Sequence, residues 1–231
     1  MEKKTFVIAI DGHSSCGKST LARQLAEKLD IVYVDSGAMY RALTWYAQQH
    51  RCFDEKDTLN RQKLIQTLPD INIDFIKKNN EHHTMLNNQD VSGLIRSMEI
   101  SKLVSEVSAV PKVRQKMVKL QRKMAQNKSL VMDGRDIGTV VFPDADLKIF
   151  LTAKEQIRAK RRFKELREQG IKTDFEAVLE NIKKRDRIDS TREVSPLKKA
   201  GDACVIDNSE LTPEEQLAKA LQLVKKKCHE N

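Results

Sequence analysis

The segment GHSSCGKST, residues 12 to 20, restricts the fold of this chain more than any other feature. It matches the pattern G-x-x-x-x-G-K-[ST], in which successive backbone N–H groups surround an anion. The apolar run FVIAI precedes it and predicts a buried parallel strand, and leucines and alanines at helical spacing follow it and predict a helix. Because the positive end of that helix points at the same place, the sequence predicts a phosphate-binding loop between a strand and a helix.

Two side chains of this loop add what the backbone cannot supply. Lys18 is placed to reach the β and γ phosphates of a nucleotide, and the hydroxyl of Ser19 to complete the ligand shell of Mg²⁺. We therefore expect a magnesium nucleotide at this loop. The residues expected to bind it are Gly12, His13, Ser14, Ser15, Cys16, Gly17, Lys18, Ser19 and Thr20.

The length and the cysteines set further limits. A chain of 231 residues can bury a substantial core and suits one α/β domain with inserted subdomains. The apolar run near the N-terminus is about five residues long, too short for a signal peptide or a membrane helix, so we expect a cytoplasmic protein without a membrane partner. The four cysteines show no C-x-x-C spacing, which predicts free thiols.

The net charge of +9 is concentrated in two stretches. Residues 112–128 carry seven Lys or Arg and no acid, and residues 154–192 carry thirteen against eight acids. In the first stretch Val113, Met117 and Leu120 recur at core spacing, which favours a helix with one solvated basic face. The alternatives are nucleic-acid binding and neutralisation of a polyphosphate. Aromatic residues are nearly absent from both stretches, so we expect no nucleic-acid partner.

Short apolar runs alternate with helical segments along the chain: TFVIAI, IVYVDS, SLVMDG, DLKIFLT and ACVIDN. This alternation predicts a three-layer α/β/α fold of the P-loop NTPase type, with a five-stranded parallel sheet. Residues 70–91 break the pattern, because they alternate polar and apolar residues and contain turn-prone KKNNE and NN. We expect a small antiparallel sheet there, inserted into the α/β core. The pattern T-P-E-E at residues 212–215 predicts a capping box that starts the last helix.

The segment DGRDIGT, residues 133–139, follows the third predicted core strand and separates the possible classes of nucleotide-binding protein. A GTPase would need the motif N-K-x-D to recognise guanine. The only Asn-Lys pair in the sequence lies in NKSL, residues 127–130, which has leucine where the motif needs aspartate. Asp133 could instead steady the Mg²⁺ shell through water, since a carboxylate suits that cation. Arg135 could hold a phosphate with both ends of its guanidinium, and Asp136 could accept hydrogen bonds from a base amine.

Four further motifs make the resemblance specific: DSGAMYR, VSGLIR, DGRDIGTVVFPDADLKIFL and KKRDRIDSTR. Together with the loop, they resemble the bacterial cytidylate kinase family, whose members transfer a phosphoryl group from ATP to CMP or dCMP. The resemblance runs from about residue 5 to the last helix and implies a single nucleoside monophosphate kinase domain over residues 1–231. Its implied parts are a core of residues 1–35, 112–153 and 193–231, a subdomain for the monophosphate at 36–111, and a lid at 154–192. It also implies ATP as donor, Mg²⁺ as metal, and a monomer.

The resemblance further implies the role of individual residues. Arg41, Arg135 and Arg192 would surround the CMP phosphate, and Arg185 and Asp189 would bind the ribose hydroxyls. The remaining substrate residues would be Ser36 at the entrance, with Ser105, Arg114 and Asp136 reading the cytosine. Cytosine offers acceptors at O2 and N3, which suit arginine, and a donor amine at N4, which suits a carboxylate.

The basic stretch 154–192 would form the lid, in which Arg158 and Arg162 close over ATP, while Arg161 and Arg167 face solvent. The residues expected to take part in catalysis are Lys18, Arg135, Arg192, Arg158 and Arg162. Two positions depart from the family pattern, because His13 replaces a frequent proline and Cys16 a small residue. We hypothesise that modification of the Cys16 thiol blocks ATP.

Two alternatives remain at this point. A P-loop kinase for another small acceptor would share the loop and the fold. An NTPase stimulated by nucleic acid would use the basic stretches instead, and its binding would depend steeply on salt.

Overall fold

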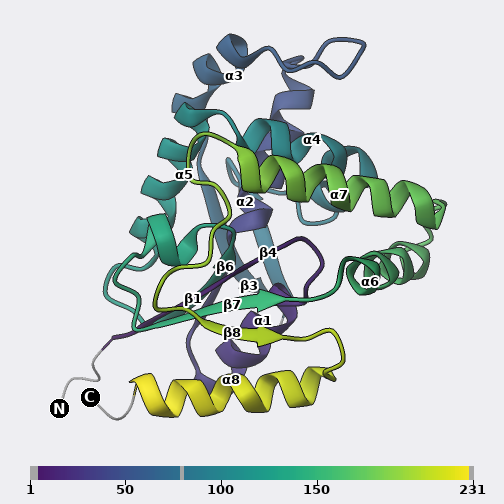
Figure 1. Ribbon diagram of the computed structural model, residues 1–231. Helices are drawn as coiled ribbons and strands as arrows, with labels where there is room; N and C mark the ends of the chain where they lie inside the picture. The colour runs from purple at the N-terminus through teal and green to yellow at the C-terminus, as the bar shows by residue number, and fades with distance from the viewer. Residues whose placement is uncertain (1–4, 79–80, 229–231) are drawn as a thin grey trace. The chain divides into compact units, whose positions relative to one another are not determined.

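The computed structural model describes residues 5–78 and 81–228 (Figure 1). The chain divides into two compact units, one of Met1–Asp35 with Ala125–Asn231 and the other of Ser36–Met124. The resemblance implied a boundary at residue 111. In the structure the helix α5, Pro111–Met124, buries Val113 and Met117 in the hydrophobic core of the second unit.

The first unit is built on the expected five-stranded parallel sheet, in the order β2-β6-β1-β7-β8. The strands are β1 (Val7–Gly12), β2 (Val32–Asp35), β6 (Leu130–Gly134), β7 (Leu147–Thr152) and β8 (Cys204–Asp207). In the central strand β1, Ile8 lies opposite Val131 of β6 and Leu147 of β7. Ile8, Ala9 and Ile10 of this strand are fully buried, as is typical of a central strand in a parallel sheet.

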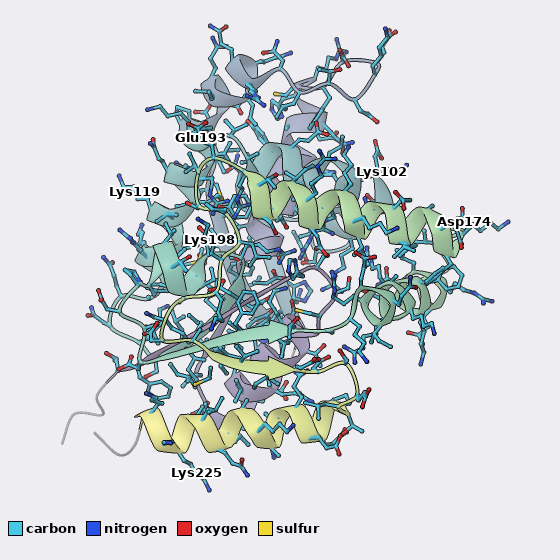
Figure 2. The ribbon with its side chains drawn as sticks, in the orientation of Figure 1. Lys102, Lys119, Asp174, Glu193, Lys198 and Lys225 are labelled. Carbon is cyan, nitrogen blue, oxygen red and sulfur yellow. The ribbon has the colours of Figure 1, made fainter. Side chains whose placement is uncertain are left out.

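Two helices pack together against this sheet: α1 (Lys18–Leu29) and α8 (Pro213–Cys228). Their buried Leu21, Leu25 and Val224 join the strand residues in one hydrophobic cluster. The predicted capping box starts α8: the backbone N–H of Glu215 donates to Oγ1 of Thr212 at 3.2 Å, and Glu215 accepts from the Thr212 N–H at 2.9 Å. Figure 2 shows Lys225 on the outer side of α8, away from the sheet.

A helical hairpin follows β7. Its helices are α6 (Glu155–Glu168) and α7 (Phe175–Thr191), and they pack against each other through buried Leu166, Val178 and Ile182. Asp174 caps the start of α7 by accepting from the Ala177 N–H at 2.7 Å, and Figure 2 shows it at that end of the helix.

The second unit contains the predicted antiparallel sheet, with β3 (Ile73–Lys78), β4 (Glu81–Leu86) and β5 (Gln89–Asp90) in that order. Around it lie helices with the bounds α2 (Ser36–Gln49), α3 (Arg61–Thr67), η1 (Leu68–Asp70), η2 (Leu94–Arg96), α4 (Met98–Ser108) and α5. Ile73 and Leu86 face each other across the β3–β4 pair and are both buried in the core of the unit. No helix among the described residues is long and apolar enough to span a membrane.

Candidate functional site

The predicted phosphate-binding loop connects β1 to α1, as its mechanism requires. Gly12 and Gly17 both have positive φ angles, 154° and 96°. A Cβ atom at Gly12 would collide with the Leu151 carbonyl of the neighbouring strand, so glycine is needed there for space as well as for conformation. Gly17 is the N-cap of α1, which leaves the first N–H groups of the helix without a side-chain cap. This is the arrangement of a helix start that binds an anion.

Lys18 is buried at the start of α1, and its Nζ donates to the His13 carbonyl at 2.7 Å. The same Nζ lies 3.7 Å from Sγ of Cys16. Burial lowers the pKa of Lys18, and the nearby positive charge of Arg135 lowers it further. The carboxylates of Asp133 and Asp11 oppose this fall, and phosphate oxygens bound at the loop would oppose it further.

Asp133, at the end of β6, lies beside the loop because β6 pairs with β1, Asp133 opposite Ile10. Its carboxylate accepts from the Ser19 hydroxyl at 2.9 Å and from the Tyr33 hydroxyl at 3.0 Å. Burial raises the pKa of Asp133 to about 6, and the negative charge of Asp35 adds to the rise.

This pair fits a magnesium ion. While its proton is donated to Asp133, the Ser19 oxygen keeps lone pairs for a cation, and Asp133 is a buried carboxylate that a divalent charge would stabilise in its ionised form. A hydroxyl and a carboxylate are also the oxygen donors that Mg²⁺ prefers.

Beyond Asp133, the chain turns through Arg135 and Asp136 into η3, a π-helical turn of Ile137–Val141. Asp11 of β1 fixes this turn, since its two carboxylate oxygens accept from the N–H groups of Ile137 and Gly138, both at 2.7 Å. Asp11 was not predicted from the sequence, although it stands out there as a single acid near the end of an otherwise apolar strand.

Alternating charges form a cluster in which Asp136, Asp189 and Arg192 are buried and Arg135 is half-buried. Nε of Arg135 donates to Oδ2 of Asp189 at 2.8 Å. Arg192 lies between the two acids, 3.7 Å from Oδ1 of Asp189 and 3.8 Å from Oδ1 of Asp136. Burial alone would raise the pKa of Asp189, but the charges of Arg135, Arg185 and Arg192 hold it below its ordinary value. The structure thus brings together the substrate residues predicted on the segment after β6 and on α7.

Arg158 and Arg162, the two arginines predicted to close over ATP, have different partners in the structure. Arg158 is buried and reaches the loop: its Nη1 donates to the Ser14 carbonyl at 3.3 Å and pairs with Asp186 of α7 at 2.6 Å. Nδ1 of His13, the residue that departs from the family pattern, lies 3.3 Å from the other oxygen of Asp186. Arg162 pairs with Glu165 of its own helix at 2.9 Å.

The expectation that Arg161 faces solvent was wrong. Its Nη1 and Nη2 donate to the side-chain and backbone oxygens of Asn208, because α6 packs close to the turn after β8. Asn208 was itself missed, and the sequence offers no local pattern that marks it. Arg167 is exposed, as expected, and lies over the Phe163 ring at 5.8 Å.

Four predicted substrate residues belong to the second unit. Ser36 begins α2, Arg41 lies one turn further on, Ser105 is on α4 and Arg114 is on α5. Arg114 is 2% exposed, donates to the Ser108 carbonyl at 3.2 Å and lies over the Tyr40 ring at 5.3 Å. A buried guanidinium that lies over an aromatic ring and donates to a backbone carbonyl has a restricted orientation, which suits recognition of a planar base.

Comparison with known proteins gives a consistent result. The family model described as cytidylate kinase matches residues 8–226. A cytidylate kinase of Bacteroides fragilis is 53% identical over 215 residues, which cover 92% of this chain and 93% of the relative. A cytidylate kinase of Flavobacterium johnsoniae is 52% identical over 224 residues, 96% of each chain. An uncharacterized protein from Eubacterium ventriosum has a similar solved structure, with a TM-score of 0.53 and 15% identity, covering 96% of this chain and 99% of that one.

Proposed function

This chain belongs to the cytidylate kinase family, and we propose that its site transfers the γ-phosphoryl group of ATP to CMP or dCMP, in line and with Mg²⁺. The observation that carries the proposal is the position of the phosphate-binding loop next to a buried arginine cluster. The loop follows β1, the segment with Arg135 and Asp136 follows β6, and these two strands are paired. The proposed donor site and the proposed site for an anionic acceptor would therefore adjoin at the carboxyl ends of neighbouring strands, where parallel sheets bind ligands.

Phosphoryl transfer of this kind needs no protein nucleophile. The transition state is loose, with charge spread over the oxygens of the moving group, so catalysis consists of alignment and electrostatic stabilisation. Lys18 would bind the β and γ phosphates, and their negative charge would raise the depressed pKa of Lys18 toward its ordinary value. Ser19 would ligate the metal directly and Asp133 through water, and bound Mg²⁺ would neutralise charge that develops on the phosphate oxygens.

The acceptor phosphate would be bound by Arg41, Arg135 and Arg192. A planar guanidinium matches phosphate oxygens with two parallel hydrogen bonds and keeps its charge at neutral pH. In the structure Arg135 and Arg192 are both paired with Asp189. We propose that Asp189 keeps the two like charges in place until CMP binds, and that Arg185 and Asp189 then also contact the ribose.

Base selection would come from Ser105, Arg114 and Asp136, with Ser36 at the entrance. Arg114 would donate to O2 and N3 of cytosine, and Asp136 would accept from the N4 amine. Uracil has a carbonyl at that place, so it would set an oxygen against the Asp136 charge and leave both groups without a hydrogen bond. We therefore propose that CMP and dCMP are favoured over UMP.

Residues 154–192, which form α6 and α7, would act as the lid. Arg158 already contacts the loop, and Arg162, paired with Glu165, would turn to the nucleotide on closure. Closure would exclude water, which otherwise competes with CMP for the phosphoryl group. A monomer in the cytoplasm, where ATP and CMP occur together, completes the proposal.

A panel of acceptors tests this function. Purified protein with ATP and Mg²⁺ is assayed for ADP release with CMP, dCMP, UMP, a non-nucleotide hydroxyl acceptor and single-stranded RNA. We expect ADP formation with CMP and dCMP, at least tenfold less with UMP, and none above background with the others. ADP release that RNA stimulates and CMP does not would replace the proposal with the NTPase alternative.

The Arg192→Ala variant adds a residue-level test. Its kcat and its kcat/KM for CMP should both fall, because the guanidinium would bind phosphate in the ground state and more strongly in the transition state. Unaltered kinetics would remove Arg192 from the site.

A further inference from the structure

Asn208 lies in the turn between β8 and α8 and is almost fully buried, 3% exposed. Its backbone N–H donates to the Thr152 carbonyl at the end of β7 at 2.9 Å, which fixes its position relative to the sheet. No role follows for it from the phosphoryl-transfer chemistry above, because it is neither charged nor nucleophilic.

The Asn208 side chain forms hydrogen bonds with three segments: the phosphate-binding loop, α8 and α6. Nδ2 donates to the Cys16 carbonyl of the phosphate-binding loop at 2.8 Å and also to Oε1 of Gln216 on α8. Oδ1 accepts from Nη1 of Arg161 on α6, and the backbone carbonyl accepts from Nη2 at 2.8 Å. A buried amide satisfied in this way has one orientation, since turning it would break bonds on both sides.

Gly17 provides the space for this contact. A Cβ atom at Gly17 would lie 2.7 Å from Nδ2 of Asn208 and 3.2 Å from Oε1 of Gln216. The amide thus lies directly against the peptide group that joins Cys16 to Gly17.

The direction of this contact determines what the peptide offers to a nucleotide. In a trans peptide the C=O and N–H bonds point in opposite directions, and no described residue of this chain has a cis peptide. Because Asn208 holds the Cys16 carbonyl, the Gly17 N–H is turned the other way, which is the side on which such loops bind phosphates. A donor on the carbonyl also polarises the peptide and strengthens its N–H as a donor.

We propose that Asn208 is a positioning residue for ATP: it orients and polarises the Cys16–Gly17 peptide so that the Gly17 N–H binds a donor phosphate. Arg161 and Gln216 hold Asn208 in that orientation. Two arginines of α6 therefore support the carbonyl side of the loop, Arg158 directly at Ser14 and Arg161 through Asn208. The inference rests on the proposed ATP site but not on the identity of the acceptor.

The Asn208→Asp variant tests the proposal with little change in shape. The carboxylate still accepts from Arg161, and the Gln216 amide can turn to donate to it, but nothing donates to the Cys16 carbonyl. We expect ATP to bind about tenfold more weakly in calorimetry without CMP, a change typical of one lost buried hydrogen bond. The KM for CMP should stay within twofold. The matched control is Asn60→Asp, because Asn60 only accepts, from the Lys63 N–H at 3.0 Å, and a carboxylate keeps that role.

A second readout separates positioning from simple stability. The amide resonance of Gly17 should shift on ADP binding in the wild type and shift much less in Asn208→Asp, while amides of the second unit stay unchanged. ATP affinity within twofold of the wild type, or equal losses for ATP and CMP, would overturn the proposal.

Should Asn208→Asp not fold, Arg161→Ala carries the test, with the exposed Arg167→Ala of the same helix as control. We expect ATP affinity to fall severalfold in Arg161→Ala but not in Arg167→Ala. The Gly17 amide resonance should also shift less on ADP binding in Arg161→Ala than in the wild type. An unchanged Gly17 resonance there would overturn the proposal. The outcome is independent of the acceptor assay, because a wild type that binds ATP but makes no CDP contradicts the proposed function and leaves these binding measurements valid.

Discussion

Arg135 and Asp189 form a partly buried ion pair in which Nε donates to Oδ2 at 2.8 Å. The pair joins the segment after β6 to α7, two parts of the chain that lie 54 residues apart in sequence. Burial by itself would lower the pKa of Arg135, but the Asp189 carboxylate raises it. The same carboxylate lies 3.7 Å from Arg192, so one acid orients two arginines that would otherwise repel each other.

The Asp189→Asn variant should therefore lose acceptor binding. Two buried guanidinium groups would share a neutral amide, and at least one would turn away from the position that suits the CMP phosphate. We expect the KM for CMP to rise about tenfold or more and kcat to fall with it, while the KM for ATP changes little, in steady-state assays. The control is Asp174→Asn, which removes the same charge from the same helix but keeps the cap at Ala177. A KM for CMP that matches the wild type would contradict this assignment.

Asp133→Asn should raise the magnesium requirement. The amide can still accept one hydrogen bond from Ser19 or Tyr33, but it has no negative charge to hold the hydrated cation. We expect half-maximal activity at a Mg²⁺ concentration about tenfold higher, with ADP binding in EDTA unchanged. The control is Asp146→Asn in the same unit, where the carboxylate only accepts from the Val7 N–H. Equal magnesium titrations for Asp133→Asn and the wild type would exclude Asp133 from the metal site.

The features that were predicted correctly from the sequence are determined by residues that lie close together in the sequence. The apolar runs became β1, β2, β6, β7 and β8, and the alternating residues after position 70 became the antiparallel sheet. Thr212 and Glu215 form their capping box, since a cap needs only four consecutive residues. The phosphate-binding loop was predictable for the same reason, because its glycines and lysine lie within nine residues.

What the sequence did not predict depends on contacts between distant segments. Asn208 meets the loop 192 residues away, and Arg161 reaches Asn208 only because α6 packs near the end of β8. The resemblance implied a core that includes residues 112–124, whereas Val113 and Met117 of α5 are buried with residues of the second unit. Asp11 was detectable, because a lone acid ending an apolar strand needs buried donors.

The pH dependence of stability should reveal Asp11. Burial raises its pKa to about 6 from an ordinary 3.8, although the N–H groups of Gly138 and Ile137 oppose the rise. A carboxyl with a raised pKa in the folded state binds its proton more tightly when folded. The stabilisation of the fold by this proton binding is therefore fully present below about pH 4, and it is lost as pH rises through 6. The shift corresponds to about 3 kcal/mol.

The Asp11→Asn variant isolates this contribution, because the amide does not titrate. Its Nδ2 meets a backbone N–H, which costs a constant amount at every pH. We expect the free energy of unfolding of the variant, relative to the wild type, to improve by about 2 to 3 kcal/mol between pH 4 and pH 7, as measured by urea denaturation. A difference between the two proteins that does not vary with pH would show that Asp11 keeps an ordinary pKa.

Cys16 should react slowly and at a cost to ATP binding. Its side chain is fully buried, and its Sγ lies 3.7 Å from the Lys18 ammonium. An alkyl group on this sulfur has no room unless the loop opens, and it would displace Lys18 from the phosphates.

We expect mass spectrometry to find iodoacetamide on the half-buried Cys204 before Cys16. Loss of activity should follow labelling of Cys16, and ATP should slow both. The Cys16→Ala variant, which keeps a small side chain, should remain active and resist the reagent. Full labelling of Cys16 with unchanged turnover would show that the loop accommodates the adduct, and rapid labelling would show that it opens freely.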